Sequence, residues 1–286
     1  MTFGSDKILP LLVYIQANLD GDLSLTALSR RARLSPSYLH RLFKSTVGET
    51  VKAYTERLRL EHGAFRLLIQ EGTLLEVALD CGYHSHETFT RAFGRRFGMP
   101  PQDYRQRARR ALPTTNVDHA DRSQQEPAFE LSATRIVRFR EIHLAFIRHT
   151  GPYETVPQDL FDTLADWAQR SGIPGPWMWM GIGHDAPATT APERLRFDAA
   201  LVVPSPFAPE GRIGHQVLAG GDFAVTKHSG PLATLGPAYA TILSRALALP
   251  RHRLVGLPAV EIYHTTGVNL AQPLHHTDIC LPVVRR

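Results

Sequence analysis

The chain has 286 residues, of which 43% are hydrophobic and 21% charged, and these fractions are close to globular averages. They exclude the disordered, fibrous and low-complexity classes, and the length favours two domains. The net charge of +5 is uneven: residues 1–112 carry 17 Lys and Arg against 11 Asp and Glu, whereas residues 113–286 carry 15 against 16. A basic part joined to a neutral part indicates a polyanion-binding module followed by a second module.

The N-terminal apolar run indicates where the protein is located, and the cysteines indicate the state of its thiols. The run from Ile8 to Ile15 is too short to span a bilayer, and no small-residue cleavage site follows it, so we expect a cytoplasmic protein without a membrane partner. Cys81 and Cys280 lie far apart in apolar surroundings, outside any Cys-x-x-Cys pair or zinc-type cluster. Their surroundings predict two buried thiols.

A repeat with an offset of 50 residues runs through the basic part. Each copy predicts a short helix, a tight turn and a second helix, first over residues 25–44 and again over residues 75–93. The matching positions are Ser35, Leu39, Arg41, Phe43, Gly48, Tyr54 and Arg57, which recur as Ser85, Phe89, Arg91, Phe93, Gly98, Tyr104 and Arg107. The sequence therefore predicts two helix-turn-helix units in an all-α domain.

Capping residues fix where these helices begin and end. Ser35 precedes a proline at the first helical position, and Thr73 with Glu76 forms a capping box. Gly48 and Gly98 predict the ends of the two second helices. Residues 52–68 lack proline and show apolar residues at near-helical spacing, which predicts a helix that holds the two units at a fixed separation.

The outward residues of the two second helices are the candidate DNA contacts. Two rigidly joined units can place these helices in successive major grooves, about 34 Å apart. The outward residues are Ser37, His40, Arg41 and Lys44 on the first helix and His86, Glu87, Thr90, Arg91 and Arg95 on the second. Arginine can bind guanine O6 and N7, and glutamate can accept from cytosine N4, so Arg41 and Arg91 are the predicted base readers. The alternative for each is a phosphate contact or a solvated charge.

The second part begins after a polar, turn-rich stretch at residues 112–128, which we interpret as a linker between domains 1–111 and 129–286. Strands are predicted at 136–148, 177–183, 197–203 and 279–284, and helices at 158–169 and 237–247. Residues 148–153 recur at 227–232, and residues 197–201 recur at 277–281. This repeat predicts an α+β domain built as a pseudo-twofold pair of strand-helix-strand-strand modules.

Glu261 is the candidate anchor of a ligand site, because it interrupts an apolar strand and has no basic neighbour. A buried carboxylate must be protonated, hydrogen bonded or paired with a cation, and each state implies a perturbed pKa. The offset of 80 places Gly181 opposite Glu261 and Gly183 opposite Tyr263.

Aromatic residues surround this carboxylate in the predicted strands. Alternation puts Trp177 and Trp179 on the face of Glu261 and Tyr263, and indoles with a phenol around a carboxylate suit a flat organic cation. Tyr153 and Phe223 are further lining candidates. The alternatives are that the tryptophans only form core and that Glu261 has a structural hydrogen-bonding role.

Metal, cofactor and catalytic patterns are weak. His275, His276 and His264 would form the best histidine cluster, but adjacent strand residues point to opposite faces and no carboxylate completes the set. No Ser/His/Asp arrangement or phosphate-binding loop is evident. We therefore expect no metal, no cofactor and no enzymatic activity.

The first 110 residues resemble the tandem helix-turn-helix domain of AraC/XylS-type transcription regulators. Residues 35–44 and 82–93 carry the resemblance, closed by residues 97–101 and by Tyr104 with Arg105, while Ser29 and Gly94 depart from the usual pattern. The resemblance implies promoter DNA and RNA polymerase as partners and activation rather than repression. It assigns DNA reading to Ser37, His40, Arg41, Glu87, Thr90 and Arg91. The N-terminal position of the domain resembles that in Rob-type regulators.

Residues 130–286 resemble the GyrI-like effector-binding domain that follows the DNA-binding part in Rob-type and some MerR-type regulators. Two His-x-Gly-Pro loops, residues 192–198 and residues 258–263 carry this second resemblance. It implies a small hydrophobic or cationic effector bound at Glu261. Two alternatives stay open: a hydrolase in which Glu261 acts as a base toward water, and a module that binds another protein.

Overall fold

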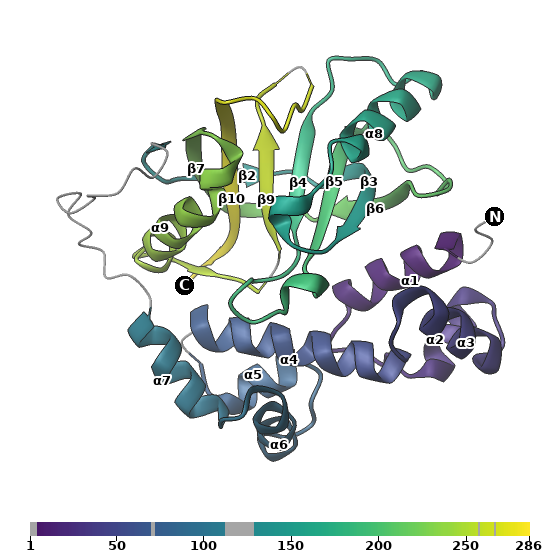
Figure 1. Ribbon diagram of the computed structural model, residues 1–286. Helices are drawn as coiled ribbons and strands as arrows, with labels where there is room; N and C mark the ends of the chain where they lie inside the picture. The colour runs from purple at the N-terminus through teal and green to yellow at the C-terminus, as the bar shows by residue number, and fades with distance from the viewer. Residues whose placement is uncertain (1–4, 70–71, 112–128, 257, 266) are drawn as a thin grey trace. The chain divides into compact units, whose positions relative to one another are not determined.

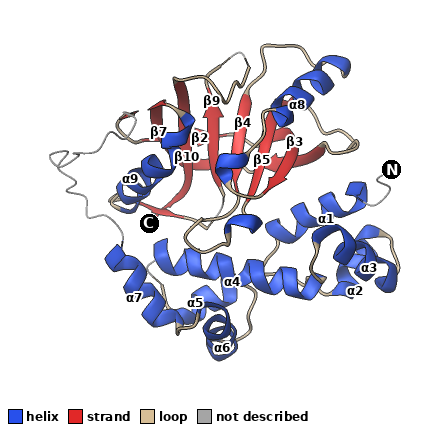
Figure 2. Ribbon diagram, viewed as in Figure 1, coloured by secondary structure: helices blue, strands red, loops and turns tan. Residues whose placement is uncertain are grey.

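The computed structural model describes residues 5–69, 72–111, 129–256, 258–265 and 267–286, which divide into two compact units (Figure 1). One unit contains residues 1–109 and 208–214, and the other contains residues 110–207 and 215–286. The described strands belong to the second unit, except for Gly214, the first residue of one strand, and Figure 2 shows the strands in red. The predicted fold class, an all-helical unit followed by an α+β unit, is confirmed. The predicted linker, residues 112–128, lies outside the described residues.

The first unit contains both predicted helix-turn-helix pairs and the helix that joins them. Its helices are α1 (Ser5–Ala17), α2 (Leu25–Ala32), α3 (Pro36–Val47), α4 (Val51–Ile69), α5 (Leu74–Asp80), α6 (His86–Phe97) and α7 (Pro101–Ala111). The apolar run that we considered as a membrane segment lies inside α1. Among the described residues, no helix is both long enough and apolar enough to cross a bilayer.

The predicted caps are present. The Ser35 hydroxyl accepts from the Tyr38 amide at 3.3 Å, and the capping box of Thr73 and Glu76 forms in both directions. Gly48 ends α3 with φ +81°, a conformation that favours glycine. Arg33, which ends α2, adopts φ +54° although it carries a side chain. No residue at or near Arg33 predicted this strained conformation.

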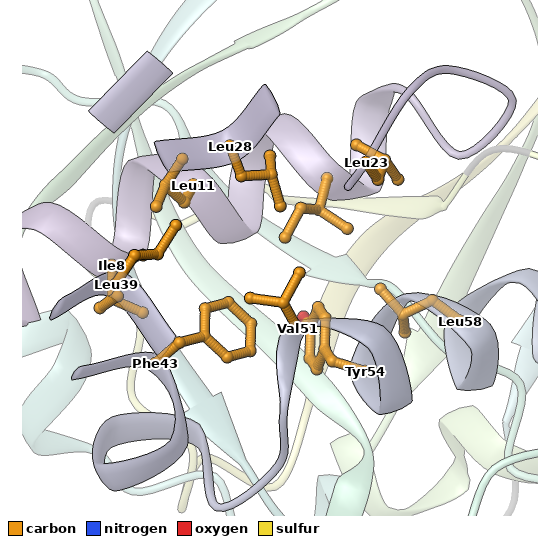
Figure 3. Packing of buried hydrophobic residues seen from close by; sticks show 10 residues of the cluster. Ile8, Leu11, Leu23, Leu28, Leu39, Phe43, Val51, Tyr54 and Leu58 are labelled. Carbon is orange, nitrogen blue, oxygen red and sulfur yellow. The ribbon is translucent and has the colours of Figure 1, made fainter. Parts of the chain in front are cut away.

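Each helix-turn-helix pair is held together by its own apolar cluster. In the first, Leu39 and Phe43 of α3 pack with residues of α1, α2 and α4 (Figure 3). In the second, Phe89 and Phe93 of α6 pack against α4 and α5. Each second helix therefore buries one apolar stripe, and its opposite face remains for solvent or a partner. Cys81 lies in the second cluster as a buried free thiol, as predicted.

The second unit is an antiparallel sheet with two long helices. Its elements are β1 (Glu130–Leu131), β2 (Arg135–Phe139), β3 (Ile142–Thr150), η1 (Tyr153–Thr155), α8 (Asp159–Arg170), β4 (Trp179–Gly183), η2 (Pro192–Arg194), β5 (Arg196–Val203), β6 (Gly214–Leu218), β7 (Gly221–Gly230), η3 (Leu232–Thr234), α9 (Leu235–Leu247), β8 (His252–Leu254), β9 (Ala259–Tyr263) and β10 (His275–Arg285). The single strand predicted over 136–148 is two strands, because the polar pair Arg140 and Glu141 separates β2 from β3. Cys280, on β10, is also a buried free thiol.

The strand order confirms the pseudo-twofold pair. The central strands lie in the order β7-β10-β9-β4-β5-β3, and the repeat equates β7 with β3, β10 with β5 and β9 with β4. Equivalent strands therefore follow one another in the same order from either end of the sheet. The axis passes between β4 and β9, where Gly181 pairs with Glu261. Helices α8 and α9 lie over the same face of the sheet (Figure 1).

Candidate functional sites

The exposed faces of α3 and α6 carry the predicted DNA contacts. Eight of the nine predicted side chains are exposed, and only Thr90 is half-buried. Arg95 forms an exposed ion pair with Glu56 of α4, and His86 lies 3.5 Å from Glu87. Hydrogen bonds lower the pKa of Glu87, so its carboxylate acts as a hydrogen-bond acceptor. The structure brings both sets of side chains to the solvent side of their helices.

A chain of ion pairs links the two helix-turn-helix pairs through α4. Arg57 of α4 is buried and pairs with Glu49, which follows α3, at 2.6 Å. Arg57 also pairs with Glu61, one turn further along α4, at 3.0 Å, and Arg96 of α6 reaches Glu61 at 3.1 Å. These contacts connect the end of α3 to α6. Sequence reasoning did not identify this function of Arg57, although the spacing of Arg57 and Glu61 was a usable signal.

Glu261 lies at the centre of the second unit, directly across the pseudo-twofold axis from Gly181. Only 7% of its surface is exposed. The hydroxyl of Tyr263 donates to one carboxylate oxygen at 2.6 Å, and the hydroxyl of Tyr239 on α9 donates to the other at 2.9 Å. Burial raises the pKa of Glu261, while these two hydrogen bonds oppose that rise. Of the predicted states of this carboxylate, the structure shows the hydrogen-bonded one.

Gly181 provides the space that this arrangement needs. A Cβ atom at Gly181 would lie 2.5 Å from the Tyr263 hydroxyl oxygen and 2.6 Å from Cζ of Phe197. These two side chains therefore occupy the surface of the sheet beside the carboxylate. The predicted position of Gly181 opposite Glu261 is confirmed.

The second register prediction is wrong. Gly183 pairs with Ala259, and Tyr263 pairs with Trp179. The two central strands are antiparallel, so a step of two residues forward on β9 is a step of two residues back on β4. This pairing puts Trp179 nearer to Tyr263 than the sequence predicted.

The aromatic residues around the carboxylate come from both modules. Trp179 is 1% exposed and lies on the face of Tyr263, and the Phe161 ring of α8 meets both side chains edge-on at about 6 Å. Trp177 precedes β4 and packs edge-on against Trp179, with its indole nitrogen donating to the Ile173 carbonyl. Sequence reasoning did not identify Phe161, Phe197 and Tyr239.

The two weaker lining candidates differ in outcome. Tyr153 packs near Phe197 and lies over Gly183, and its hydroxyl donates to the Asp185 carbonyl. Phe223 does not join the site. It pairs with Pro282, three residues from the Ile279 that pairs with Glu261, so its side chain lies on the opposite face of the sheet and stacks on Phe139.

That opposite face carries a buried ion network. Asp198 of β5 accepts two hydrogen bonds from Arg148, and His184 and Gln216 also reach it. Burial alone would raise the pKa of Asp198, but Arg148 and His184 hold it well below the usual range. The network joins residues of β3, β5 and β6 to the residue after β4, which gives it a structural function.

The histidine cluster considered as a metal site does not converge. His264 pairs with Asp278 at 3.2 Å, and His276 lies 2.9 Å from the Ser229 hydroxyl. The described part of the chain contains no group of three or more potential metal ligands.

Two family models match the chain. A helix-turn-helix domain model matches residues 28–107, and the model described as "GyrI-like small molecule binding domain" matches residues 132–284. The second match covers more than half of the chain and includes Glu261 and its surroundings.

Curated relatives match about a third of the chain. Regulatory protein SoxS of Escherichia coli K12 is 33% identical over 97 residues, which are 34% of this chain and 91% of that protein. Right origin-binding protein of the same strain is 36% identical over 95 residues, a third of each chain, and the transcriptional regulator Rob of Salmonella typhimurium matches with the same values.

Two solved structures show a likeness to parts of the chain. The DNA-binding domain of AdpA in complex with a target DNA is 24% identical with a TM-score of 0.36, and the match covers 37% of this chain and 95% of that one. The C-terminal domain of EcmrR is 17% identical with a TM-score of 0.42, and covers 55% of this chain and 99% of that domain.

Proposed function

Because the chain belongs to the GyrI-like small-molecule-binding family and to the AraC family of DNA-binding transcription regulators, we propose that it is a one-component activator. In this proposal the first unit binds an asymmetric promoter site, and the second binds a small hydrophobic or cationic effector. The observation that supports the effector most directly is the buried Glu261 among aromatic side chains. RNA polymerase is the expected downstream partner.

For DNA, the proposal assigns base reading to both second helices. Arg41 and Arg91 occupy equivalent repeat positions on α3 and α6, and both are exposed. The ion pairs from Glu49 through Arg57 and Glu61 to Arg96 limit how far α6 can move relative to α3. A fixed separation favours two contacts on one face of the duplex, because no free energy is then spent on aligning the helices.

The test of DNA reading uses Arg41→Ala and Arg91→Ala, with Lys52→Ala on the exposed side of α4 as the matched control. Each arginine variant should weaken binding to the cognate site by about 1 to 3 kcal/mol and relax specificity at one base pair, if the contact to guanine is bidentate. Lys52→Ala should leave base preference unchanged. Equal losses on cognate and random DNA, with a lower salt dependence, would instead assign Arg41 and Arg91 to phosphates.

For the effector, the proposal makes Glu261 the partner of a cation. Burial disfavours the free carboxylate, and a bound cation would offset that cost by direct pairing. Tyr239 and Tyr263 keep the carboxylate in place, and Trp179 and Phe161 add aromatic surface that a flat cation can contact. Tyr263 and Phe197 fill the space over Gly181, so an effector must displace or repack these rings. The site would then have two conformations, one with these rings over Gly181 and one with them displaced, and an effector would favour the second.

The test compares wild type with Glu261→Gln, which keeps the shape and removes the charge. Tetraphenylphosphonium serves as the cation and triphenylphosphine oxide as the neutral probe, with tryptophan quenching as the signal. The substitution should weaken cation binding by about 2 to 5 kcal/mol if the pair is desolvated, and should change neutral binding little. Glu193→Gln, at an exposed carboxylate of the same unit, is the control. Equal cation affinity in wild type and Glu261→Gln would remove Glu261 from the site.

A further inference from the structure

The indole nitrogen of Trp179 is a buried donor without a partner. Trp179 is 1% exposed, and its Nε1 has no hydrogen-bond partner among the described residues. An indole N–H can only donate, and buried donors in folded proteins are nearly always paired. The neighbouring Trp177 meets this expectation, because its Nε1 donates to the Ile173 carbonyl at 3.0 Å. Of the two adjacent indoles, one is satisfied and the other is not.

The residue that carries the unpaired donor is next to the Glu261 site in the sheet register. Trp179 pairs directly with Tyr263 across β4 and β9, and the Tyr263 hydroxyl donates to Glu261. Side chains of directly paired residues lie about 5 Å apart at Cβ, and a diagonal pair such as Trp179 and Glu261 lies about 7 Å apart. The indole and the carboxylate are therefore close enough for one small molecule to contact both.

The same cross-strand row contains two more unpaired polar atoms. Thr277 of β10 pairs with Tyr263 on its other side, and His228 of β7 pairs with Thr277. The Thr277 hydroxyl and the His228 Nδ1 atom are both buried and have no partner among the described residues. The row from His228 to Trp179 spans three strand spacings, about 14 Å. Such a row suits an occupant that is polar as well as aromatic.

We propose that the Trp179 indole donates a hydrogen bond to the effector, so that the effector combines a cationic centre with a hydrogen-bond acceptor about 5 to 8 Å away. The acceptor is a carbonyl, ether or ring nitrogen, because an indole N–H cannot accept and its positive end repels a second cation. This inference rests on the proposed function, since it takes the cation to lie at Glu261. The indole would thereby select effectors that carry a hydrogen-bond acceptor, which aromatic side chains without a polar group cannot do.

The first test uses two matched cations, 4-acetyl-1-benzylpyridinium and 4-isopropyl-1-benzylpyridinium. They have similar shape and the same charge, and only the first has a carbonyl oxygen, about 5 Å from the ring nitrogen, within the range set by cross-strand spacing. Calorimetric titration of the full chain should show about tenfold tighter binding of the acetyl compound, the size of one good hydrogen bond. Trp179→Phe should abolish this preference, and Trp177→Phe should keep it. The preference is the ratio of the affinities of the two compounds for the same protein. A general loss of affinity caused by repacking of the variant therefore cancels in this ratio.

The second test needs no substitution in the measured protein. The chain has three tryptophans, so its ¹H–¹⁵N spectrum contains three indole signals, which single Trp→Phe variants assign. The Trp179 proton should move downfield with the acetyl compound and not with the isopropyl compound. The Trp177 proton, bonded to Ile173, should not shift with either.

The outcomes separate this inference from the proposed function. If both cations bind and Glu261→Gln weakens both, but wild type shows no preference or Trp179→Phe retains it, the hydrogen bond from Trp179 is refuted and the effector site stands. An unmoved Trp179 signal on binding of the acetyl compound also refutes it. If neither cation binds wild type, or Glu261→Gln leaves binding unchanged, the proposed cation site fails and this inference fails with it.

Discussion

A single methyl group at Gly181 should disrupt the centre of the second unit. The Cβ of Gly181→Ala would lie 2.5 Å from the Tyr263 hydroxyl oxygen and 2.6 Å from Cζ of Phe197, well inside van der Waals contact. Both atoms are at the ends of side chains, so the rings can move, but Tyr263 then leaves Glu261. Loss of a hydrogen bond to a carboxylate costs about 1.5 to 3 kcal/mol, and overpacking costs about 1 to 3 kcal/mol. These effects share the movement of Tyr263 and do not add fully, so we expect a total of about 2 to 4 kcal/mol.

Tryptophan fluorescence is a suitable assay for this destabilisation, because all three tryptophans, at positions 167, 177 and 179, belong to the second unit. Urea unfolding of the full chain followed by fluorescence therefore reports on that unit. Gly236→Ala is the matched control. Gly236 lies in α9 and a Cβ atom there would meet nothing within 4 Å, so the free energy of unfolding of this variant should equal that of wild type or be slightly higher. If Gly181→Ala lies within about 0.5 kcal/mol of wild type, the close packing described over Gly181 is refuted.

Three further predictions concern His62, Arg33 and the protonation of Glu261. Burial and Arg66 lower the pKa of His62 from 6.5 to about 4, so the unfolded chain takes up a proton that the folded unit does not. Stability of the helical unit, followed by circular dichroism, should therefore fall by about 2 kcal/mol between about pH 7.5 and pH 5, and His62→Gln should reduce this loss. Arg33→Gly should stabilise the same unit by about 0.5 to 1 kcal/mol because it relieves φ +54°, whereas Arg30→Gly inside α2 should destabilise it. Burial raises the pKa of Glu261 and a bound cation favours its carboxylate, so cation binding at acidic pH should release protons. Titrations in buffers of different ionisation enthalpy should show this release in wild type and not in Glu261→Gln.

The helical unit was predictable because its signals are local. Ser35, Thr73 with Glu76, and Gly98 each act within one turn of the helix end that they fix, so the residues themselves identify the boundaries. Arg33 shows the limit of this reasoning. Its turn needs a positive φ, but the sequence has no glycine or asparagine there. The amides of Arg33 and Leu34 bond back to the carbonyls of the last turn of α2 and accompany this conformation instead.

The internal repeat of the sheet was predictable from the sequence. The face of the sheet that each side chain occupies was less predictable. The offset of 80 residues identified the two modules, but the face that a side chain occupies depends on the register between strands far apart in sequence. Phe223 was assigned to the wrong face for this reason. The short strands β1, β6 and β8 gave no usable signal, because alternation over two to five half-exposed residues is not distinguishable from a loop.

The pseudo-twofold axis explains why the site has one carboxylate and not two. Strict symmetry would place a second glutamate at position 181, directly across the axis from Glu261 and about 5 Å away at Cβ. Two carboxylates at that distance in a buried site repel each other, and one would hold a proton. With Gly181 there instead, the freed space admits Tyr263 and Phe197, and the single carboxylate gains a donor. Under the proposed function, a site made in this way would select one cationic centre and leave the other side of the axis, where Trp179 lies, for a neutral polar group.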